Sequence, residues 1–319
     1  MRETMISSRH EISRHLGLHK LYASDAVVGG RGTRDRVSRT HAPPRVAPMV
    51  EGELFLMFDV TDFHRDGFVV LDAFFVDEEL RMIQDQSDRV LHENAETRTV
   101  EAGTQVVRAT HGNHRSSAFF EHLVRLPRLL DIAEELLGGR VYVHQFKINA
   151  KLGLVGDLWA WHQDYRFWRD EDGMPSPNAL TIAVFLDEVH EFNGPLMLVP
   201  GSHAGRLIPV TSEEDDDDWS STLSADLKHQ IGEDALREAL KDKEIVAPKG
   251  PAGTAIVFHS NILHGSAPNM SPDPRRVLLV SYNAVANALE SMESPRPEFL
   301  ASRDFEPVSA GPARLHPVR

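Results

Sequence analysis

The spacing of apolar residues along the chain changes near Gly139. Before this point, apolar positions recur at helical intervals, first from Asp77, which can cap a helix, to Leu91, and then from Pro127 to Leu137. After it, short apolar runs are separated by Gly, Pro and Asn, which are typical of turns. The pattern predicts strands over 141–150, 180–187, 196–199, 254–258 and 276–282.

The order of these elements indicates the fold class. Helices come first and strands later, without the regular alternation of a doubly wound parallel sheet. We therefore expect an antiparallel barrel or jelly roll, mainly β with helices on its flank (α+β). An acidic run at 213–218 and an expected helix over 234–241 interrupt the strands, and we expect a solvated insertion near the mouth of the barrel.

Charge is unevenly distributed along the 319 residues. The chain has 48 acidic and 34 basic side chains, a formal charge of −14. Residues 1–50 hold nine of the basic and four of the acidic side chains, which leaves 25 against 44, a charge of −19, for 51–319. We expect a disordered basic extension over 1–50, or else a targeting or docking tail, ahead of one domain over 51–319. The acidic domain argues against nucleic acid as a partner.

The composition also limits the kinds of site and location. The chain has no cysteine, so disulfides and thiolate metal sites are excluded, and any metal must be held by His, Asp or Glu. No apolar run approaches the ~18 residues of a membrane-spanning helix, so we expect no membrane partner. We expect a cytoplasmic protein that is a monomer or a homodimer.

The expected strand over 141–150 has one polar face. Side chains alternate along a strand, so Gln145, Lys147 and Asn149 share one side. The other side is formed by Tyr142, His144, Phe146 and Ile148. The polar face either lines a wet cavity that orients a small ionic ligand, or belongs to an edge strand and faces solvent.

A candidate metal site begins at the sequence WHQDY. His162 and Asp164 lie two residues apart, and in an extended segment both side chains point to the same side. Two histidines and one carboxylate form the facial triad that is diagnostic of non-haem Fe(II) oxygenases. The second histidine would be one of three distant candidates, His203, His259 and His264.

His264 is the best placed of these candidates, because it follows an expected strand and opens a turn. Arg275 comes eleven residues later, at the start of the next strand. A guanidinium group at that position can bind a dicarboxylate through two parallel hydrogen bonds.

Several motifs together resemble the phytanoyl-CoA dioxygenase superfamily of Fe(II)/2-oxoglutarate oxygenases. They are WAWHQDYRFWRDEDGMP, NGPLMLVPGSH, LHGSAPNMSPDPR and SYNAVANAL, which occur in this order. The resemblance covers roughly 60–305. Within the superfamily, RATHGNH, VYVHQFKINAK, LSADL and PRPEFLASRD are similar to bacterial members that hydroxylate free cyclic amino acids. Members that act on ectoine share part of these runs, but the chain departs from their signature at Gln163, Arg166, Phe167 and Arg169.

The resemblance implies a double-stranded β-helix, a cupin-like jelly roll, with Fe(II), 2-oxoglutarate and O2 as cofactor and co-substrates and ascorbate as reductant in vitro. The implied iron ligands are His162, Asp164 and His264. The implied residues for 2-oxoglutarate are Arg275, Gln145, Asn149, Thr181 and Ser266. For the substrate, the candidates are Lys147 and Arg108 for its carboxylate, Trp168 for an apolar wall, and His111.

The implied activity is hydroxylation of a free cyclic amino acid, with succinate and CO2 as co-products. L-Proline, hydroxylated at the trans-4 position, is the first candidate, and ectoine or L-pipecolate is the alternative. Two other classes remain open. One is a catalytically silent jelly roll that binds a small acid, and the other is a metal-dependent hydrolase, which needs a general base beside the metal.

Overall fold

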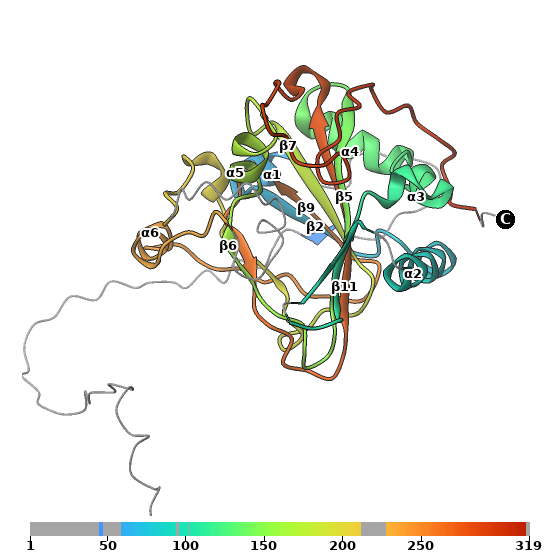
Figure 1. The fold of residues 1–319 in the computed structure, drawn as a ribbon, viewed down its shortest axis with the longest axis horizontal. Coiled ribbons are helices and arrows are strands. Elements are labelled where there is room, and N and C mark those ends of the chain that lie inside the picture. The colour runs from blue at the N-terminus through green and yellow to red at the C-terminus, as the bar shows by residue number, and fades with distance from the viewer. Residues whose placement is uncertain (1–44, 47–58, 94–95, 102, 212–227, 317–319) are drawn as a thin grey trace, which may run out of the picture. The chain divides into compact units, whose positions relative to one another are not determined.

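The computed structural model describes residues 45–46, 59–93, 96–101, 103–211 and 228–316 (Figure 1). The predicted basic extension and the acidic run at 213–218 lie outside these residues, apart from 45–46, and stay predictions. No helix in the described part of the chain is long and apolar enough to cross a membrane.

A large sheet of eight strands forms the centre of the fold. Its spatial order is β1-β2-β9-β7-β11-β5-β4-β3, and every pair is antiparallel except β1 with β2. The strands are β1 (Arg45–Val46), β2 (Phe68–Leu71), β3 (Arg98–Val100), β4 (Val107–His111), β5 (Val141–Lys151), β7 (Ala179–Phe185), β9 (Ala255–His259) and β11 (Arg275–Ala284).

A second sheet has three short antiparallel strands in the order β6-β10-β8. They are β6 (Trp159–His162), β8 (Leu196–Leu198) and β10 (His264–Ser266). The expected jelly roll with flanking helices is confirmed. All five predicted strands are present with slightly different ends, whereas β1, β2, β3, β4, β6 and β10 were not predicted.

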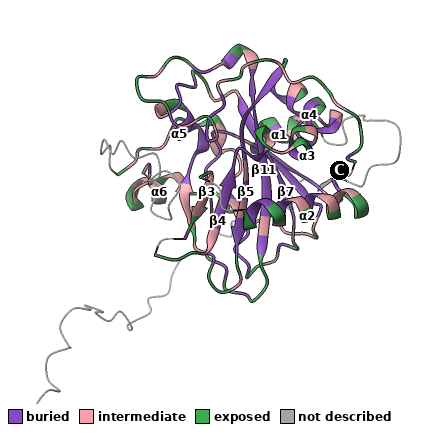
Figure 2. Cartoon of the chain, turned by 45° about the vertical axis from the view of Figure 1, so that its right-hand side comes forward, coloured by how far each residue is buried: buried purple, intermediate pink, exposed green. Residues whose placement is uncertain are grey.

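The large sheet is buried on both faces (Figure 2). Along β7, Leu180, Ile182 and Val184 pack into one core together with the helices. Ala183 and Phe185 pack into a second core, which also includes residues of β8 and therefore lies between the two sheets. This double burial explains why the strands read as continuous apolar runs.

Helices cover the face of the large sheet that is turned away from the small sheet (Figure 1). They are α2 (Asp77–His92), α3 (Ala118–Leu123) and α4 (Pro127–Leu137), and the other helices are α1 (Val60–Asp66), α5 (Asp164–Asp170) and α6 (Glu233–Ala239). Short 3₁₀ turns span Asn113–Arg115, Ser202–Ala204 and Val285–Asn287.

The ends of the predicted helices α2 and α4 agree with the expected capping residues, with one exception. Pro127 opens α4, and Gly138 ends it with a φ of 71°, a left-handed conformation that glycine adopts without strain. The predicted capping role of Asp77 is wrong. Val76 occupies the cap position without a side-chain hydrogen bond, and Asp77 is the first helical residue, where its charge favours the helix dipole instead.

Strand β5 contains a β-bulge at His144. Its pairing with β11 runs from Lys151 to Gln145 and then skips one residue. The extra residue reverses the alternation beyond it, so Val143 joins Phe146 in the core beneath the helices. The predicted apolar face is therefore wrong at residues 142 and 144, while the polar face of the strand is intact.

Candidate metal centre and co-substrate pocket

Three buried side chains meet between the two sheets. His162 ends β6, Asp164 opens α5 two residues later, and His264 opens β10 opposite His162. Oδ1 of Asp164 lies 3.5 Å from Nε2 of His162 and 3.8 Å from Nε2 of His264. The three ligand atoms lie within 4.8 Å of one another, which suits a single metal ion. The predicted extended conformation holds through Gln163, and α5 begins at the next residue, Asp164.

The other two histidine candidates are elsewhere. The rings of His203 and His259 pack against each other, 5.1 Å apart, and neither residue lines the cavity beside the triad. His264 is therefore the histidine that completes the set.

Backbone carbonyls fix the orientation of both histidine rings. Nδ1 of His162 lies 2.7 Å from the carbonyl oxygen of Ala160, and Nδ1 of His264 lies 2.9 Å from that of Ile262. A carbonyl oxygen only accepts, so each Nδ1 carries the hydrogen and donates it. Each Nε2 then turns a lone pair toward Asp164, as a metal-binding histidine requires.

The charges of the triad also suit a divalent cation. Burial and the neighbouring His162 lower the pKa of His264 to about 4, so its imidazole is neutral at pH 7. Burial by itself raises the pKa of Asp164, but the opposing effects, of which the Lys147 ammonium is the largest, outweigh it and hold that pKa well below its usual range. One carboxylate and two imidazoles form a donor set that fits Fe(II).

A cavity extends from the triad between the sheets. Gln145, Lys147 and Asn149 line it, so the polar face of β5 faces a cavity and does not belong to an edge strand, while its role toward a ligand stays a prediction. Other predicted site residues that line the cavity are His111, Trp168, Ser266 and Arg275. Apolar lining residues include Phe167, Ala183, Phe185, Leu196, Phe258 and Leu279.

Arg275 provides a buried cation in this cavity. Its Nη2 donates to the carbonyl oxygen of Gly194 at 2.5 Å, and its Nε has no hydrogen-bond partner among the described residues. Burial lowers the pKa of Arg275 to about 10, so the group is charged at pH 7. The Asn149 Oδ1 atom is also buried without a partner in the described structure. Because an unpaired buried donor is costly, this end of the cavity fits the distal carboxylate of 2-oxoglutarate.

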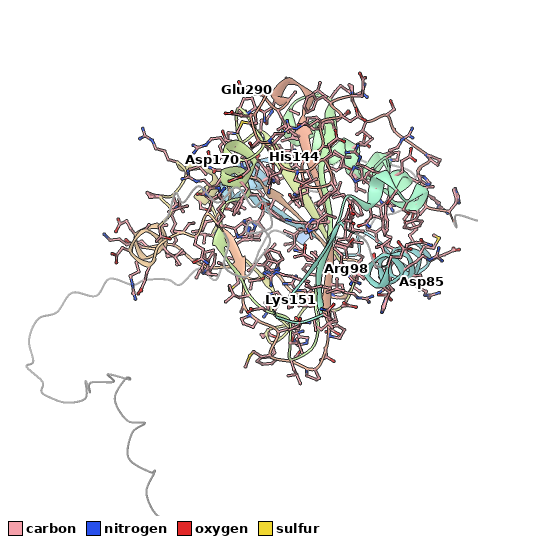
Figure 3. All side chains as sticks on the ribbon, viewed as in Figure 1. Asp85, Arg98, His144, Lys151, Asp170 and Glu290 are labelled. Atoms are coloured by element: carbon pink, nitrogen blue, oxygen red, sulfur yellow. The ribbon has the colours of Figure 1, made fainter. Side chains whose placement is uncertain are left out.

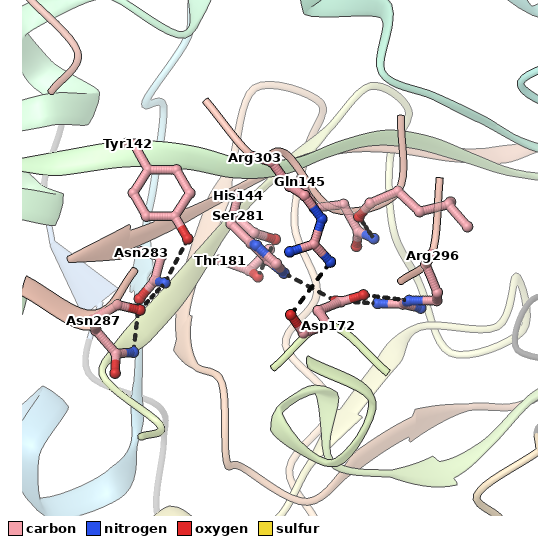
Figure 4. Close-up of polar contacts among 11 residues, drawn as sticks. Tyr142, His144, Gln145, Asp172, Thr181, Ser281, Asn283, Asn287, Arg296 and Arg303 are labelled. Carbon is pink, nitrogen blue, oxygen red and sulfur yellow. Dashed lines mark hydrogen bonds and ion pairs between the residues drawn. The ribbon is translucent and has the colours of Figure 1, made fainter. Parts of the chain in front are cut away.

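The structure corrects two predicted site residues. Thr181 forms a hydrogen bond with Ser281, 2.8 Å between the hydroxyl oxygens, and does not line the cavity (Figure 4). Arg108 does not line it either. Its guanidinium group pairs with Glu101 at 2.9 Å and lies 3.7 Å from the ring centre of Trp159, so it supports the cavity wall from behind.

Sequence reasoning missed a different arginine. Arg296 lines the cavity and forms two hydrogen bonds with the carboxylate of Asp172, at 2.8 and 2.6 Å (Figure 4). His144, at the β-bulge, lies 3.6 Å from the same carboxylate and packs against Trp168. One indication of this pair is present in the sequence, since Asp172 lies in the family-like run EDGMP and Arg296 in PRPEF. Residue spacing cannot predict a contact between segments that are 124 residues apart.

Comparisons with known proteins agree with this geometry. The family model for phytanoyl-CoA dioxygenase (PhyH) matches residues 63–277. The chain is 40% identical to an L-proline trans-4-hydroxylase of Streptomyces griseoviridis over 249 residues, 77% of this chain and 92% of the relative. It is 38% identical to an ectoine dioxygenase of Sphingopyxis alaskensis over 272 residues, 82% of this chain and 89% of the relative.

A solved structure provides a further comparison. EctD from S. alaskensis with bound Fe has a TM-score of 0.70 at 33% identity, covering 86% of this chain and 95% of that one. The same protein with 2-oxoglutarate and 5-hydroxyectoine has a TM-score of 0.68 at 34% identity, covering 87% and 95%. With the triad in place and Arg275 buried in the cavity beside it, the chain belongs to the phytanoyl-CoA dioxygenase family and is an iron- and 2-oxoglutarate-dependent dioxygenase.

Proposed function

We propose that the enzyme hydroxylates a free cyclic amino acid, with L-proline, at the trans-4 position, as the first candidate. The observation that carries this proposal is a pair of polar groups beside the triad. Lys147 on β5 and His111 on β4 are directly paired across the sheet, and both line the cavity. The L-proline trans-4-hydroxylase at 40% identity supports the choice of substrate.

Lys147 supplies a charge that is available to a ligand. Its ammonium makes no hydrogen bond or ion pair with any other residue that the structure describes, yet its charge acts on Asp164 and His111. An amino-acid carboxylate would form a charge-assisted hydrogen bond with this group. His162, Asp164 and His264 would hold the iron, which together with 2-oxoglutarate supplies the oxidation of an unactivated C–H bond.

His111 suits the nitrogen of the same substrate. Burial lowers the pKa of His111 to about 3, and the Lys147 charge acts in the same direction, so the ring is neutral. Its Nδ1 is buried without a hydrogen-bond partner in the described structure. A neutral ring nitrogen accepts a hydrogen bond from the secondary ammonium of a cyclic amino acid. Trp168 and Phe167 would form the apolar wall against the ring carbons.

These contacts define which carbon faces the metal. With the carboxylate held at Lys147 and the nitrogen at His111, the amino-acid ring has little freedom to rotate. A fixed orientation matters because a displacement of about 1 Å can lower the rate about a hundredfold. Ectoine is the main competitor, since an ectoine dioxygenase is 38% identical, and L-pipecolate differs from L-proline by only one methylene.

Succinate release tests the proposal. The purified protein is supplied with Fe(II), ascorbate and 2-oxoglutarate and offered L-proline, L-pipecolate or ectoine, and product masses are measured in parallel. We expect succinate to rise with L-proline, together with a product one oxygen atom heavier. Turnover only with ectoine would contradict the choice of L-proline. No succinate with any of the three compounds would mean that the substrate is a different molecule.

A further inference from the structure

Lys151 is a buried lysine without a role in the mechanism above. It is 1% exposed and ends β5 (Figure 3). Alternation along the strand puts it on the same side as Lys147 and Asn149, although Lys151 is not one of the residues that line the cavity. Its Cα is paired with that of Arg275 on β11. A basic side chain therefore lies beside Arg275, on the neighbouring strand.

The Nζ atom of Lys151 forms hydrogen bonds with the backbone where β10 ends. Its Nζ donates to the carbonyl oxygens of Ser266, at 3.4 Å, and Ala267. The stem of the side chain packs against Gly194, where an added Cβ would lie 3.2 Å from Cδ of Lys151 and 2.5 Å from the oxygen of Ala267. The carbonyl of Gly194 is the one that accepts from Arg275. Lys151 and Arg275 therefore both contact Gly194, one through its stem and the other through a hydrogen bond.

The charges around Lys151 leave a place for an anion. Burial lowers the pKa of Lys151 to about 6, and the Arg275 and Arg108 cations act in the same direction, against Glu101 and Asp157. Glu101 is already paired with Arg108. Two neighbouring buried cations are unfavourable until a negative charge joins them. A dicarboxylate at Arg275 would provide that charge.

We infer that Lys151 is a positioning residue of the co-substrate pocket, which braces the wall behind Arg275 and supplies a second positive charge for the distal carboxylate of 2-oxoglutarate. As the dianion binds, the Lys151 amine takes one proton from solvent and becomes an ammonium ion. The inference rests on the dependence on 2-oxoglutarate and not on the identity of the amino acid.

The test is the binding of 2-oxoglutarate to the Fe(II)-loaded protein under nitrogen, measured by isothermal titration calorimetry. Titrations at pH 7 in two buffers with different ionisation enthalpies count the protons taken up. We expect proton uptake in the wild type. In Lys151→Met we expect none, and an affinity about tenfold weaker, the usual scale for losing one charge-assisted contact.

Two further variants separate charge from packing. Met has a similar length and apolar stem, so Lys151→Met removes the amine without opening a cavity, and thermal unfolding should show only the small loss that comes from the two missing hydrogen bonds to Ser266 and Ala267. Lys151→Gln keeps hydrogen-bond donors for the two carbonyls, and it should likewise lose the proton uptake. Lys241→Met, at an exposed lysine outside the cavity, should leave the 2-oxoglutarate affinity within about twofold.

Two results would overturn the inference. One is an affinity for 2-oxoglutarate that is unchanged within twofold in both Lys151 variants. The other is proton uptake that persists in either of them. Because no amino acid is present in these titrations, a wrong choice of substrate would not affect either result.

Discussion

Replacing Asp172 by Asn tests the buried ion pair that holds Arg296 at the cavity wall. Asp172 is fully buried, Arg296 is 6% exposed, and their two hydrogen bonds measure 2.8 and 2.6 Å. The change removes the negative charge while nearly preserving the shape of the side chain. A buried guanidinium group is left without its counter-charge.

The expected loss of stability is large. Breaking one side of a buried ion pair costs about 3–5 kcal/mol, because the remaining charge stays out of water. At about 2–4 °C for each kcal/mol in a domain of this size, the melting temperature should fall by about 6–20 °C. The Michaelis constant for the amino acid should rise as well, since Arg296 lines the cavity.

The pH dependence of this loss has a definite sign. Burial raises the pKa of Asp172, but Arg296 and His144 outweigh it and hold the pKa below its usual range. A lowered folded pKa stabilises the native state above the unfolded value, about 3.9, and this contribution disappears as pH falls through the folded pKa. The difference in the free energy of unfolding between the wild type and Asp172→Asn should therefore be largest at pH 7 and decrease only below about pH 4.

The assay is urea denaturation of the wild type, Asp172→Asn and the double variant Asp172→Leu with Arg296→Met. The double variant removes both charges, so it should be more stable than Asp172→Asn although its amino-acid binding stays impaired. A loss below about 1 kcal/mol in Asp172→Asn would refute this reasoning, since surface ion pairs have that strength.

Four other outcomes are expected. Asp164→Ala should abolish both hydroxylation and tight Fe(II) binding, and undiminished turnover would contradict the triad. Arg275→Ala should raise the Michaelis constant for 2-oxoglutarate at least about tenfold and leave that for the amino acid nearly unchanged, whereas equal effects on both would contradict its role. Thr181→Val should leave the 2-oxoglutarate constant unchanged, and a tenfold rise would restore the original prediction. Fe(II) affinity should be weak at pH 4, where His264 becomes protonated; an affinity at pH 4 equal to that at pH 7 would contradict His264 as a ligand.

The sequence predicted the features that depend on short-range patterns. Strand alternation placed Gln145, Lys147 and Asn149 on one face, and the spacing of His162 and Asp164 brought both to one ion. Both inferences needed only a few consecutive residues. The bulge at His144 could not be predicted, because no glycine or other local signal marks the extra residue.

Long-range packing determined which arginine reaches the cavity. Arg108 lies on a strand next to β5 and was a reasonable candidate, but Glu101, seven residues earlier, binds its charge. Arg296 follows the last strand in an irregular segment, and Asp172 holds it across 124 residues of sequence. Which acidic partner meets which arginine depends on the closed fold, and periodicity carries no information about it.

The backbone bonds of His162 and His264 separate two properties of this enzyme. Each ring makes a hydrogen bond to a carbonyl two residues earlier in its own strand or turn, and Phe167 and Phe258 of the cavity pack against the two rings. Other residues of the cavity can therefore change in evolution or by design while these backbone bonds to the metal-ligand rings are kept. Such modularity gives a physical reason why relatives of similar identity carry the names of different substrates, and it makes the cavity wall the natural target for redirecting the enzyme to new rings.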